Sequence, residues 1–480
     1  MITNNGKILS DKDIKRALRT SMLAGSFGFA WFAVAGGPPV ALLVDFLSDS
    51  GLILGLSVML QQISFAVQIP STLFFETLYS RKKLWGALLI LQRLSWITPA
   101  VVPLIFPSNP EFAALIFVCM IGASSIIGQA CAPVWLNWIA TLIPQKIRGR
   151  YWSLRQCVLF VSFILMTLFS GWILDFIPSP DKPNGTYIGF TVVFSVAALL
   201  GTIDIIIHLF IPEPKYEPKT KFSLFNTIER IMHPFKNSDY LWMTISISFW
   251  YLAMGIVGAF GIIYLRKSLL LSYSEISLLV ITSSLGTILI GLPLGFLIDK
   301  AGARTSAVIS MIIMPIFGIL WFFITPGSYI FSFPGLGKCS LPHAVLLFGV
   351  ANLISGGLAS TIGTCQFHML SSLIPENRRT MAFAAHWTLV GVLSATGPLI
   401  GGIIMDMDVE SLNYTFFTGV KFSYIHILVV LYIIVILFIS VPCMLKVKIR
   451  TGEIPILLLL SNIKNGNPLR AVSAIYNIYQ

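Results

Sequence analysis

Long apolar stretches separated by short polar connections recur along the whole chain. An α-helix of about 20 apolar residues crosses a hydrocarbon core roughly 30 Å thick. Twelve spans are predicted, at residues 21–46, 52–78, 84–106, 112–142, 152–177, 187–211, 240–264, 275–297, 304–325, 343–372, 382–405 and 422–445. The pattern therefore predicts an all-α integral membrane protein.

The longest polar connection between spans divides them into two sets of six. It covers residues 212–239 and is expected to be a cytoplasmic loop. We expect one six-helix bundle before it, at residues 21–211, and a second after it, at residues 240–447.

The two ends of the chain are more polar than the spans. Residues 1–20 are predicted to be a cytoplasmic segment, and Ser10 and Asp13 have the spacing of a helix capping box. We expect them to begin a short helix on the membrane surface. Residues 448–480 are predicted to be a cytoplasmic amphipathic tail.

One stretch of sequence occurs twice. The residues that repeat 231 positions apart are Leu142, Ile143, Pro144 and Arg148, which correspond to Leu373, Ile374, Pro375 and Arg379. In the same register Gly171 and Asp175 correspond to Gly402 and Asp406. An internal repeat of this length predicts two similar halves, so the twelve helices are expected to form two pseudo-symmetric six-helix bundles.

Composition and charge agree with a membrane protein. The chain is 56% hydrophobic and 11% charged, whereas soluble domains carry about 25% charged residues. Most of the 32 lysines and arginines fall in the connections on the side of the N-terminus; the other side holds Lys182, Arg266, Lys267, Lys338 and Lys421. The positive-inside rule then predicts a multi-pass protein of the cell (plasma or inner) membrane with both termini cytoplasmic. The net charge of +12 is explained by topology, and no basic domain suggests nucleic acid as a partner.

The connection after the eighth span carries a recognisable motif. It reads GFLIDKAGAR, with Gly295, Asp299, Lys300, Gly302 and Arg304. This resembles the cytoplasmic loop signature of the major facilitator superfamily, G-x-x-x-D-[RK]-x-G-[RK]-[RK]. A degraded copy follows the second span, where Thr72 and Glu76 replace the glycine and the aspartate.

The resemblance implies two bundles that rock about a midplane cavity, with cytoplasmic loops that gate this cavity and do not bind the solute. The residues assigned to the gate are Glu76, Arg81, Arg148, Arg150, Gly295, Asp299, Lys300, Arg304 and Arg379. The eleventh span reads GPLIGG, from Gly397 to Gly402, which is similar to an antiporter motif of the family. We expect it to be a close-packed, slightly bent helix.

In this family helices 1, 4, 7 and 10 surround the cavity, and helices 5 and 11 adjoin it. The candidate cavity residues are Trp31, Gln129, Asn137, Arg155, Gln156, Trp250, Tyr251, Gln366, His368, His386 and Trp387. Arg155 and His386 are repeat mates and are expected to face each other. Such a pair suits an anionic solute; closure of the cytoplasmic gate is the alternative. His208, His343 and His426 are assigned no role.

Two charges lie deep inside predicted spans. Arg93 is about 14 Å into the third span, and Asp204 is about 10 Å from the same surface in the sixth. Because ionisable groups in hydrocarbon are costly, we expect a structural ion pair between them; a role in proton coupling is the alternative.

The sequence predicts a monomeric transporter that moves a small solute, with anions the first class to examine. Energisation stays open between facilitated movement and coupling to protons or another ion. No cofactor, metal or enzymatic activity is expected, and the chain lacks the Walker A sequence of an ATPase. Two rival functions remain, a transport-dead sensor on the same fold and a membrane-embedded transferase.

Overall fold

The computed structural model describes residues 8–106, 108–144, 147–177, 183–215, 224–291, 298, 301–333, 337–374 and 379–448. Most of these residues are helical. The helices of the first half are α1 (Asp11–Ala35), α2 (Pro38–Leu47), α3 (Gly51–Ile63), η1 (Ser64–Val67), α4 (Gln68–Glu76), α5 (Lys82–Ser95), α6 (Thr98–Ile105), α7 (Pro110–Leu142), α8 (Arg148–Phe176) and α9 (Pro183–His208). The central connection carries α10 (Leu224–Met232) and η3 (His233–Lys236).

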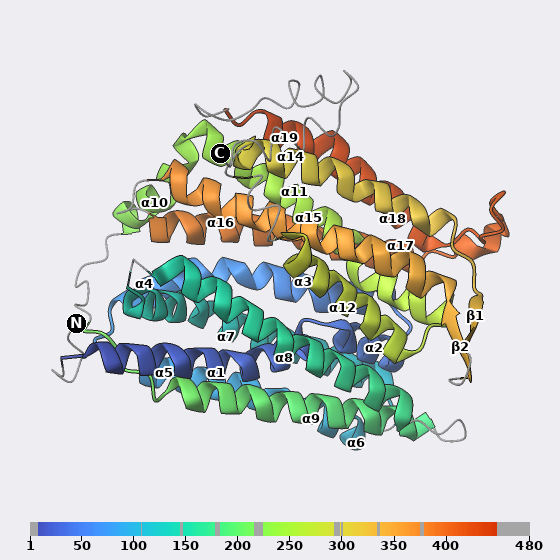
Figure 1. Cartoon of the computed structure of the whole chain (residues 1–480), viewed down its shortest axis with the longest axis horizontal. Coiled ribbons are helices and arrows are strands. Elements are labelled where there is room, and N and C mark those ends of the chain that lie inside the picture. Colours follow the sequence, from blue (N-terminus) through green and yellow to red (C-terminus); the bar gives the residue numbers. More distant parts are fainter. Residues whose placement is uncertain are drawn as a thin grey trace.

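The second half continues in the same way. Its elements are α11 (Ser238–Lys267), α12 (Tyr273–Leu289), α14 (Ala303–Ile313), η4 (Met314–Phe322), β1 (Ser328–Phe333), β2 (Gly337–Pro342), α15 (His343–Leu373), α16 (Arg379–Ser394), α17 (Thr396–Met405), η6 (Val409–Leu412), α18 (Tyr424–Ile434), the π-helix η7 (Val435–Ser440) and α19 (Val441–Leu445). Helices of the first half, blue to green, form one layer, and most of the second half forms the other (Figure 1).

The all-α membrane fold predicted from the sequence is confirmed. Within the described residues, ten helical segments are long and apolar enough to cross a membrane. The predicted span 84–106 is two helices, α5 and α6, which meet at Trp96 and Ile97. The predicted span 275–297 begins as α12 and is described only to residue 291. The count of twelve therefore stays a prediction.

The N-terminal segment differs from its prediction. Ser10 and Asp13 form the capping box that was expected, and helix α1 begins at Asp11. However, α1 runs without a break to Ala35, so residues 11–20 continue into the helix of the first predicted span and do not form a separate short helix. No proline interrupts this stretch, and helices propagate easily once begun. The predicted tail, at residues 448–480, lies outside the described residues except for Lys448.

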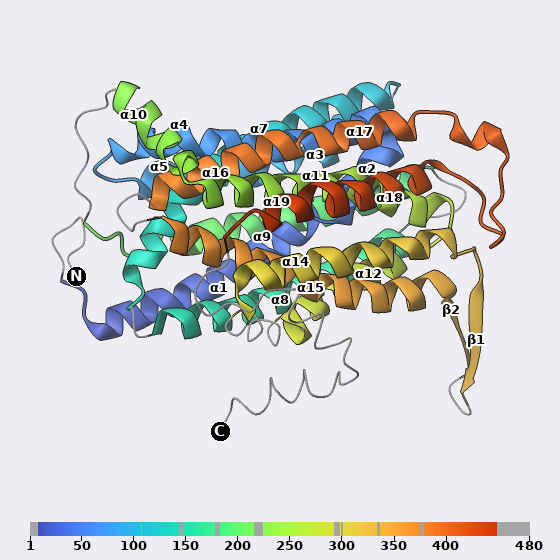
Figure 2. The same ribbon diagram turned by 90° about the horizontal axis from the view of Figure 1, so that it is seen from above.

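Two local elements were not predicted. The central connection contains the short helix α10, and the connection at 326–342 contains an antiparallel hairpin in which Tyr329 pairs with Leu341. This hairpin lies at one end of the helical layers in both views, and we call that end the hairpin end (Figures 1 and 2). The opposite end, where α1 begins and α19 ends, is called the basic end.

Helices of the two halves touch backbone to backbone near the hairpin end. Helix α3 packs against α17, and α8 packs against α12. A Cβ atom on Gly402 would lie 2.4 Å from the Gly51 carbonyl oxygen, and one on Gly55 would lie 2.4 Å from that of Pro398. Only glycine permits so close an approach, so the glycines of the GPLIGG stretch serve helix packing.

Two carboxylates tie the halves together at the same end. Asp406 accepts hydrogen bonds from the backbone N–H groups of Gly51 at 2.5 Å and Leu52 at 2.9 Å, at the start of α3. Asp175 accepts from Tyr273 at 2.9 Å and Ser274 at 2.7 Å, at the start of α12. Each carboxylate therefore satisfies two free N–H groups and meets the positive end of a helix dipole.

An ion pair strengthens this closure. The Lys267 Nζ atom, at the end of α11, lies 2.9 Å from the Asp45 Oδ1 atom and 2.9 Å from the Asp49 Oδ1 atom. Asp45 belongs to α2, so this contact also joins the halves. The hairpin end is thus closed by two close helix pairs, two helix caps and one charged contact.

Candidate functional site

A cavity of about 560 Å³ lies among the helices of the first half and is completed by two side chains of the second. Its wall comes from α1, the α3–η1 segment, α5, α7, α8 and α9, with Tyr251 of α11 and Trp387 of α16. The lining positions on α1 run from Gly25 to Ala35, where the helix ends. Trp85 and His208 lie within three residues of helix termini at the basic end, and Arg155 lies seven residues into α8 from the same end. The cavity therefore extends from the middle of the bundle toward the basic end.

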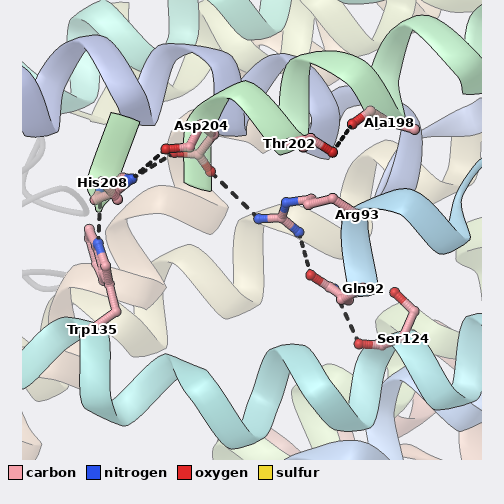
Figure 3. Close-up of polar contacts among 8 residues, drawn as sticks. All are labelled: Gln92, Arg93, Ser124, Trp135, Ala198, Thr202, Asp204 and His208. Atoms are coloured by element: carbon pink, nitrogen blue, oxygen red, sulfur yellow. Dashed lines mark hydrogen bonds and ion pairs between the residues drawn. The ribbon is translucent and has the colours of Figure 1, made fainter. Parts of the chain in front are cut away.

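A charged network crosses one side of this cavity (Figure 3). The Arg93 Nη2 atom lies 3.7 Å from the Asp204 Oδ2 atom, and both side chains are about nine-tenths buried. Arg93 also donates from Nη1 to the Gln92 Oε1 atom at 2.7 Å, and its guanidinium stacks 3.5 Å above the Trp31 ring. The structure thus places at ion-pair distance the two intramembrane charges that were expected to meet.

His208 extends the network beyond Asp204. Its Nδ1 atom lies 2.8 Å from the Asp204 Oδ1 atom, and its Nε2 atom accepts a hydrogen bond from the Trp135 indole N–H at 3.0 Å. An indole nitrogen only donates, so Nε2 carries no proton in this arrangement. The proton of a neutral His208 then lies on Nδ1 and points at the carboxylate.

Arg155 stands on another part of the wall. Its guanidinium carbon lies 4.8 Å from the centre of the Trp135 ring and 5.6 Å from that of Trp152. The side chain is 7% exposed, and a Cβ atom on Gly25 would lie 2.5 Å from its Nη2 atom. Glycine in α1 and two tryptophans therefore make the space that this arginine occupies.

Aromatic and amide side chains close the cavity against the second half. The Phe65 ring stacks on Trp387 with centroids 5.2 Å apart, and Tyr251 meets the same tryptophan at 5.8 Å. Gln62 accepts a hydrogen bond from Ser394 at 3.3 Å. This wall consists of contacts between the halves, so any relative movement of the halves changes it.

Five of the eleven cavity candidates line the cavity: Trp31, Gln129, Arg155, Tyr251 and Trp387. The Gln129 side chain accepts from Gln68 Nε2 at 2.7 Å. The cavity is displaced into the first half, which explains why the second half contributes few of its residues.

The other six candidates lie outside the cavity. His386 is completely buried in the second half, between Thr244 at 2.9 Å and Gln366 at 2.8 Å, so it satisfies Gln366 and does not face Arg155 across the cavity. Trp250 is buried beside Tyr251. The remaining three, Asn137, Gln156 and His368, are exposed on the surfaces of their helices.

Sequence reasoning missed several lining residues. His208 was assigned no role, although it follows Asp204 by four residues and so shares its helix face. Gln92 and Gln62 were overlooked because α5 and α3 were not expected to reach the cavity. Within the described residues, no group of three His, Cys, Asp or Glu side chains is arranged to hold a metal ion.

The predicted gate lies at the basic end and is described in part. The Arg81 backbone N–H donates to Glu213 at 2.8 Å, and Arg304 Nη2 donates to the Leu445 carbonyl oxygen at 2.5 Å, at the end of α19. Glu76 is the last residue of α4. Arg148 and Arg379 are the first residues of α8 and α16, which is consistent with their place in the repeat. The side chains of Arg148, Arg150 and Arg379 lie outside the described residues, as do Gly295, Asp299 and Lys300 entirely.

Solved structures share this fold. Neither models of known protein families nor curated protein sequences match the chain. The nucleoside transporter NupG superposes with a TM-score of 0.60 at 15% identity, over 91% of this chain and all of its own. A D-xylose–proton symporter gives 0.60 at 18% identity, over 91% of this chain and 99% of its own.

A bacterial homologue of the iron transporter ferroportin, in its inward-facing state, gives 0.59 at 15% identity over 92% of this chain and all of its own. The chain therefore has the fold of the major facilitator superfamily transporters, as its loop motif indicated. At such low identity the likeness concerns the fold alone.

Proposed function

We propose that the chain carries a small solute across a membrane by alternating access. The observation that supports this most is the cavity itself: it holds about 560 Å³, within the range of ligand sites, and both halves contribute to its wall. The halves close together at the hairpin end, so the solute site is sealed from that side. A sensor that had lost transport would be expected to fill this space with side chains.

The basic end is the cytoplasmic face in this proposal, because lysines and arginines gather in the connections there. The present arrangement is then the state that is closed to the outside. Separation of α3 from α17 and of α8 from α12 would open the cavity to the outside, while the gate residues at the basic end come together.

A reversible crosslink at the hairpin end tests this proposal. The Ser50 Oγ and Asp406 Oδ2 atoms are 3.4 Å apart, so the two side chains face each other across the halves, and cysteines at both positions provide the crosslink. The exposed native residues Cys119 and Cys157 would first be replaced by serine. Uptake of labelled solutes into proteoliposomes would identify a cargo for the reduced protein.

Oxidation should abolish that uptake, and reduction should restore it in the same sample. The variant with only the Asp406→Cys change is the matched control, because it loses the same cap of α3 but cannot crosslink within one chain. Full uptake by the oxidised double-cysteine protein would contradict alternating access at this end. Absence of uptake for every solute, with the protein folded and correctly inserted, would contradict transport.

A further inference from the structure

The charged groups of the cavity do not balance. Its lining contains two guanidinium groups, Arg93 and Arg155, and one carboxylate, Asp204. Asp204 pairs with Arg93 and also meets His208, whose hydrogen bonds are those of a neutral ring. The described wall therefore carries one positive charge in excess. A lone charge is costly to bury away from water, so this excess calls for a counter-charge.

The excess charge belongs to Arg155. Within the described residues no carboxylate lies at ion-pair distance from it, whereas Arg93 has Asp204 at 3.7 Å. Two indole rings and the glycine opposite hold its guanidinium in place. Cation–π contacts orient a guanidinium but leave its N–H groups free to donate in the plane of the group. Arg155 also interacts with the Tyr151 hydroxyl and, at longer range, with Asp204. Because Asp204 already pairs with Arg93, the set of three charges keeps one positive charge in excess.

The hydrogen-bonding groups of the wall also favour an anionic ligand. Four buried polar atoms of the lining have no hydrogen-bond partner among the described residues: the Nε atoms of Arg93 and Arg155 and the Nε1 atoms of Trp31 and Trp85. All four are donors, whereas no buried acceptor of the described lining lacks a hydrogen-bond partner. Protein atoms cover these four donors, so they show only that the wall is rich in donors. A ligand can reach the accessible part of the Arg155 side chain, and an acceptor such as an oxyanion suits it.

The shape of the wall indicates the rest of the ligand. The cavity exceeds the volume needed for an inorganic anion, and Trp31, Trp96, Phe65, Tyr251 and Trp387 line it. Aromatic rings favour a flat or apolar molecular body, which can stack on them. Amide side chains such as Gln62 and Gln129 add a few polar contacts.

We propose that the cavity binds an organic monocarboxylate, whose carboxylate pairs with Arg155 and whose apolar or aromatic body packs against the tryptophans. This rests on the proposed transport function and names its solute class. A single negative charge makes the lining neutral. A neutral molecule leaves Arg155 without a counter-charge, and a dianion leaves one negative charge in excess.

Binding to the purified full-length protein, measured by calorimetry and thermal shift, directly tests the preference for a ligand with a single negative charge. The probes are benzoate, hexanoate and indole-3-acetate, each paired with its own amide, and phthalate as a dianion. At least one acid should bind, and it should bind at least about tenfold more tightly than its amide and than phthalate. Amides that bind as tightly as the acids, or no binding by any acid at millimolar concentration, would overturn the proposal.

Substitution of the arginine provides the second test. Arg155→Met should weaken the binding of the best acid at least about tenfold while leaving its amide unchanged, and Arg155→Lys should retain part of the preference. Arg16→Met removes the same charge from an exposed position on α1 and should change neither value. Equal acid binding by the wild type and Arg155→Met would show that this arginine is not the anion site. The comparison of acids with amides in the wild type holds even if a variant misfolds.

Different experimental results would contradict the proposed solute class and the proposed transport function. If acids bind but are never carried into proteoliposomes, the monocarboxylate site stands and transport is contradicted. If the acids do not bind and another solute is taken up, transport stands and this inference is wrong.

Discussion

Asp204 is the only carboxylate that the described structure places at ion-pair distance from the Arg93 guanidinium, and both are buried in a predicted span. Removal of one partner from a buried ion pair leaves the other charge uncompensated, which costs about 3–5 kcal/mol. Asp204→Ala should therefore lower the free energy of unfolding by about that amount. Reversible unfolding of the purified protein in mixed micelles measures it.

A double variant separates the pair from the packing around it. In Arg93→Met/Asp204→Leu both charges are gone and similar volumes remain, so most of the lost stability should return. If the double variant is as unstable as Asp204→Ala, the cost arises from packing or from the lost bond to His208, and the ion pair does not account for it.

Individual residues of the cavity differ in how well they could be identified from the sequence. Arg93 and Asp204 were identifiable because charges inside apolar stretches are rare. The neutral residues of the cavity carry no such signal. Gln366 and His386 have the same character as Gln129 and His208, and only the direction of the side chain separates a lining residue from one that is satisfied inside the second half. That direction depends on packing that the sequence does not express.

At the scale of helices, the close pair α3 and α17 depends on glycine. A methyl group on Gly402 would lie 2.4 Å from a backbone oxygen, so Gly402→Ala must push the two helices apart at the hairpin end. Overpacking of this kind costs about 1–3 kcal/mol. We expect the variant to populate a state with the hairpin end open. Spin labels at exposed positions 112 and 412, in place of Phe112 and Leu412, would report it as a longer distance.

Gly258 and Gly363 supply matched controls. No atom lies within 4 Å of a Cβ at either position, so alanine should leave the distance distribution unchanged. An unchanged distribution in Gly402→Ala itself would mean that the α3–α17 contact does not determine closure.

The helices themselves were largely predictable, and their interruptions were less so. Span-length apolar stretches placed most helices within a few residues. The break between α1 and α2 occurs just before Pro38, because proline removes a backbone hydrogen bond. However, Pro133 lies inside α7 and does not interrupt that helix. The strands of the hairpin β1–β2 are too short to be recognised within a polar connection. The amphipathic pattern of α10 is also too short to be recognised in this way.

At the scale of the whole molecule, the contacts that close the hairpin end occur twice, in positions that follow the sequence repeat. Asp175 and Asp406 are repeat mates, and the helix starts that they cap, near Gly51 and Ser274, are related by the offset of 223 that also relates the two loop motifs. Gly171 and Gly402, also repeat mates, each face the start of the partner helix. The repeat was visible in the sequence, but that its aspartates join the two halves was not, because their partners are backbone N–H groups with no sequence signature.

This symmetry predicts that the two caps contribute alike to closure of the hairpin end. Asparagine in place of either aspartate keeps the shape but removes the charge that meets the helix dipole and one of the two acceptor oxygens, for a net cost of about 1 kcal/mol. Asp175→Asn and Asp406→Asn should each raise the ratio of open to closed molecules about fivefold, as measured with the same pair of spin labels. Because both caps oppose one opening movement, the free energies should add in the double variant, to a change of roughly thirtyfold.

Asp408→Asn is the matched control, because this carboxylate is exposed at the same end and caps neither α3 nor α12. It should leave the ratio unchanged. A double variant no more open than the single variants would show that one cap alone governs closure, and the two halves would then not move as symmetric partners. An effect of Asp406→Asn with none of Asp175→Asn would place the hinge at α8–α12 and the opening at α3–α17.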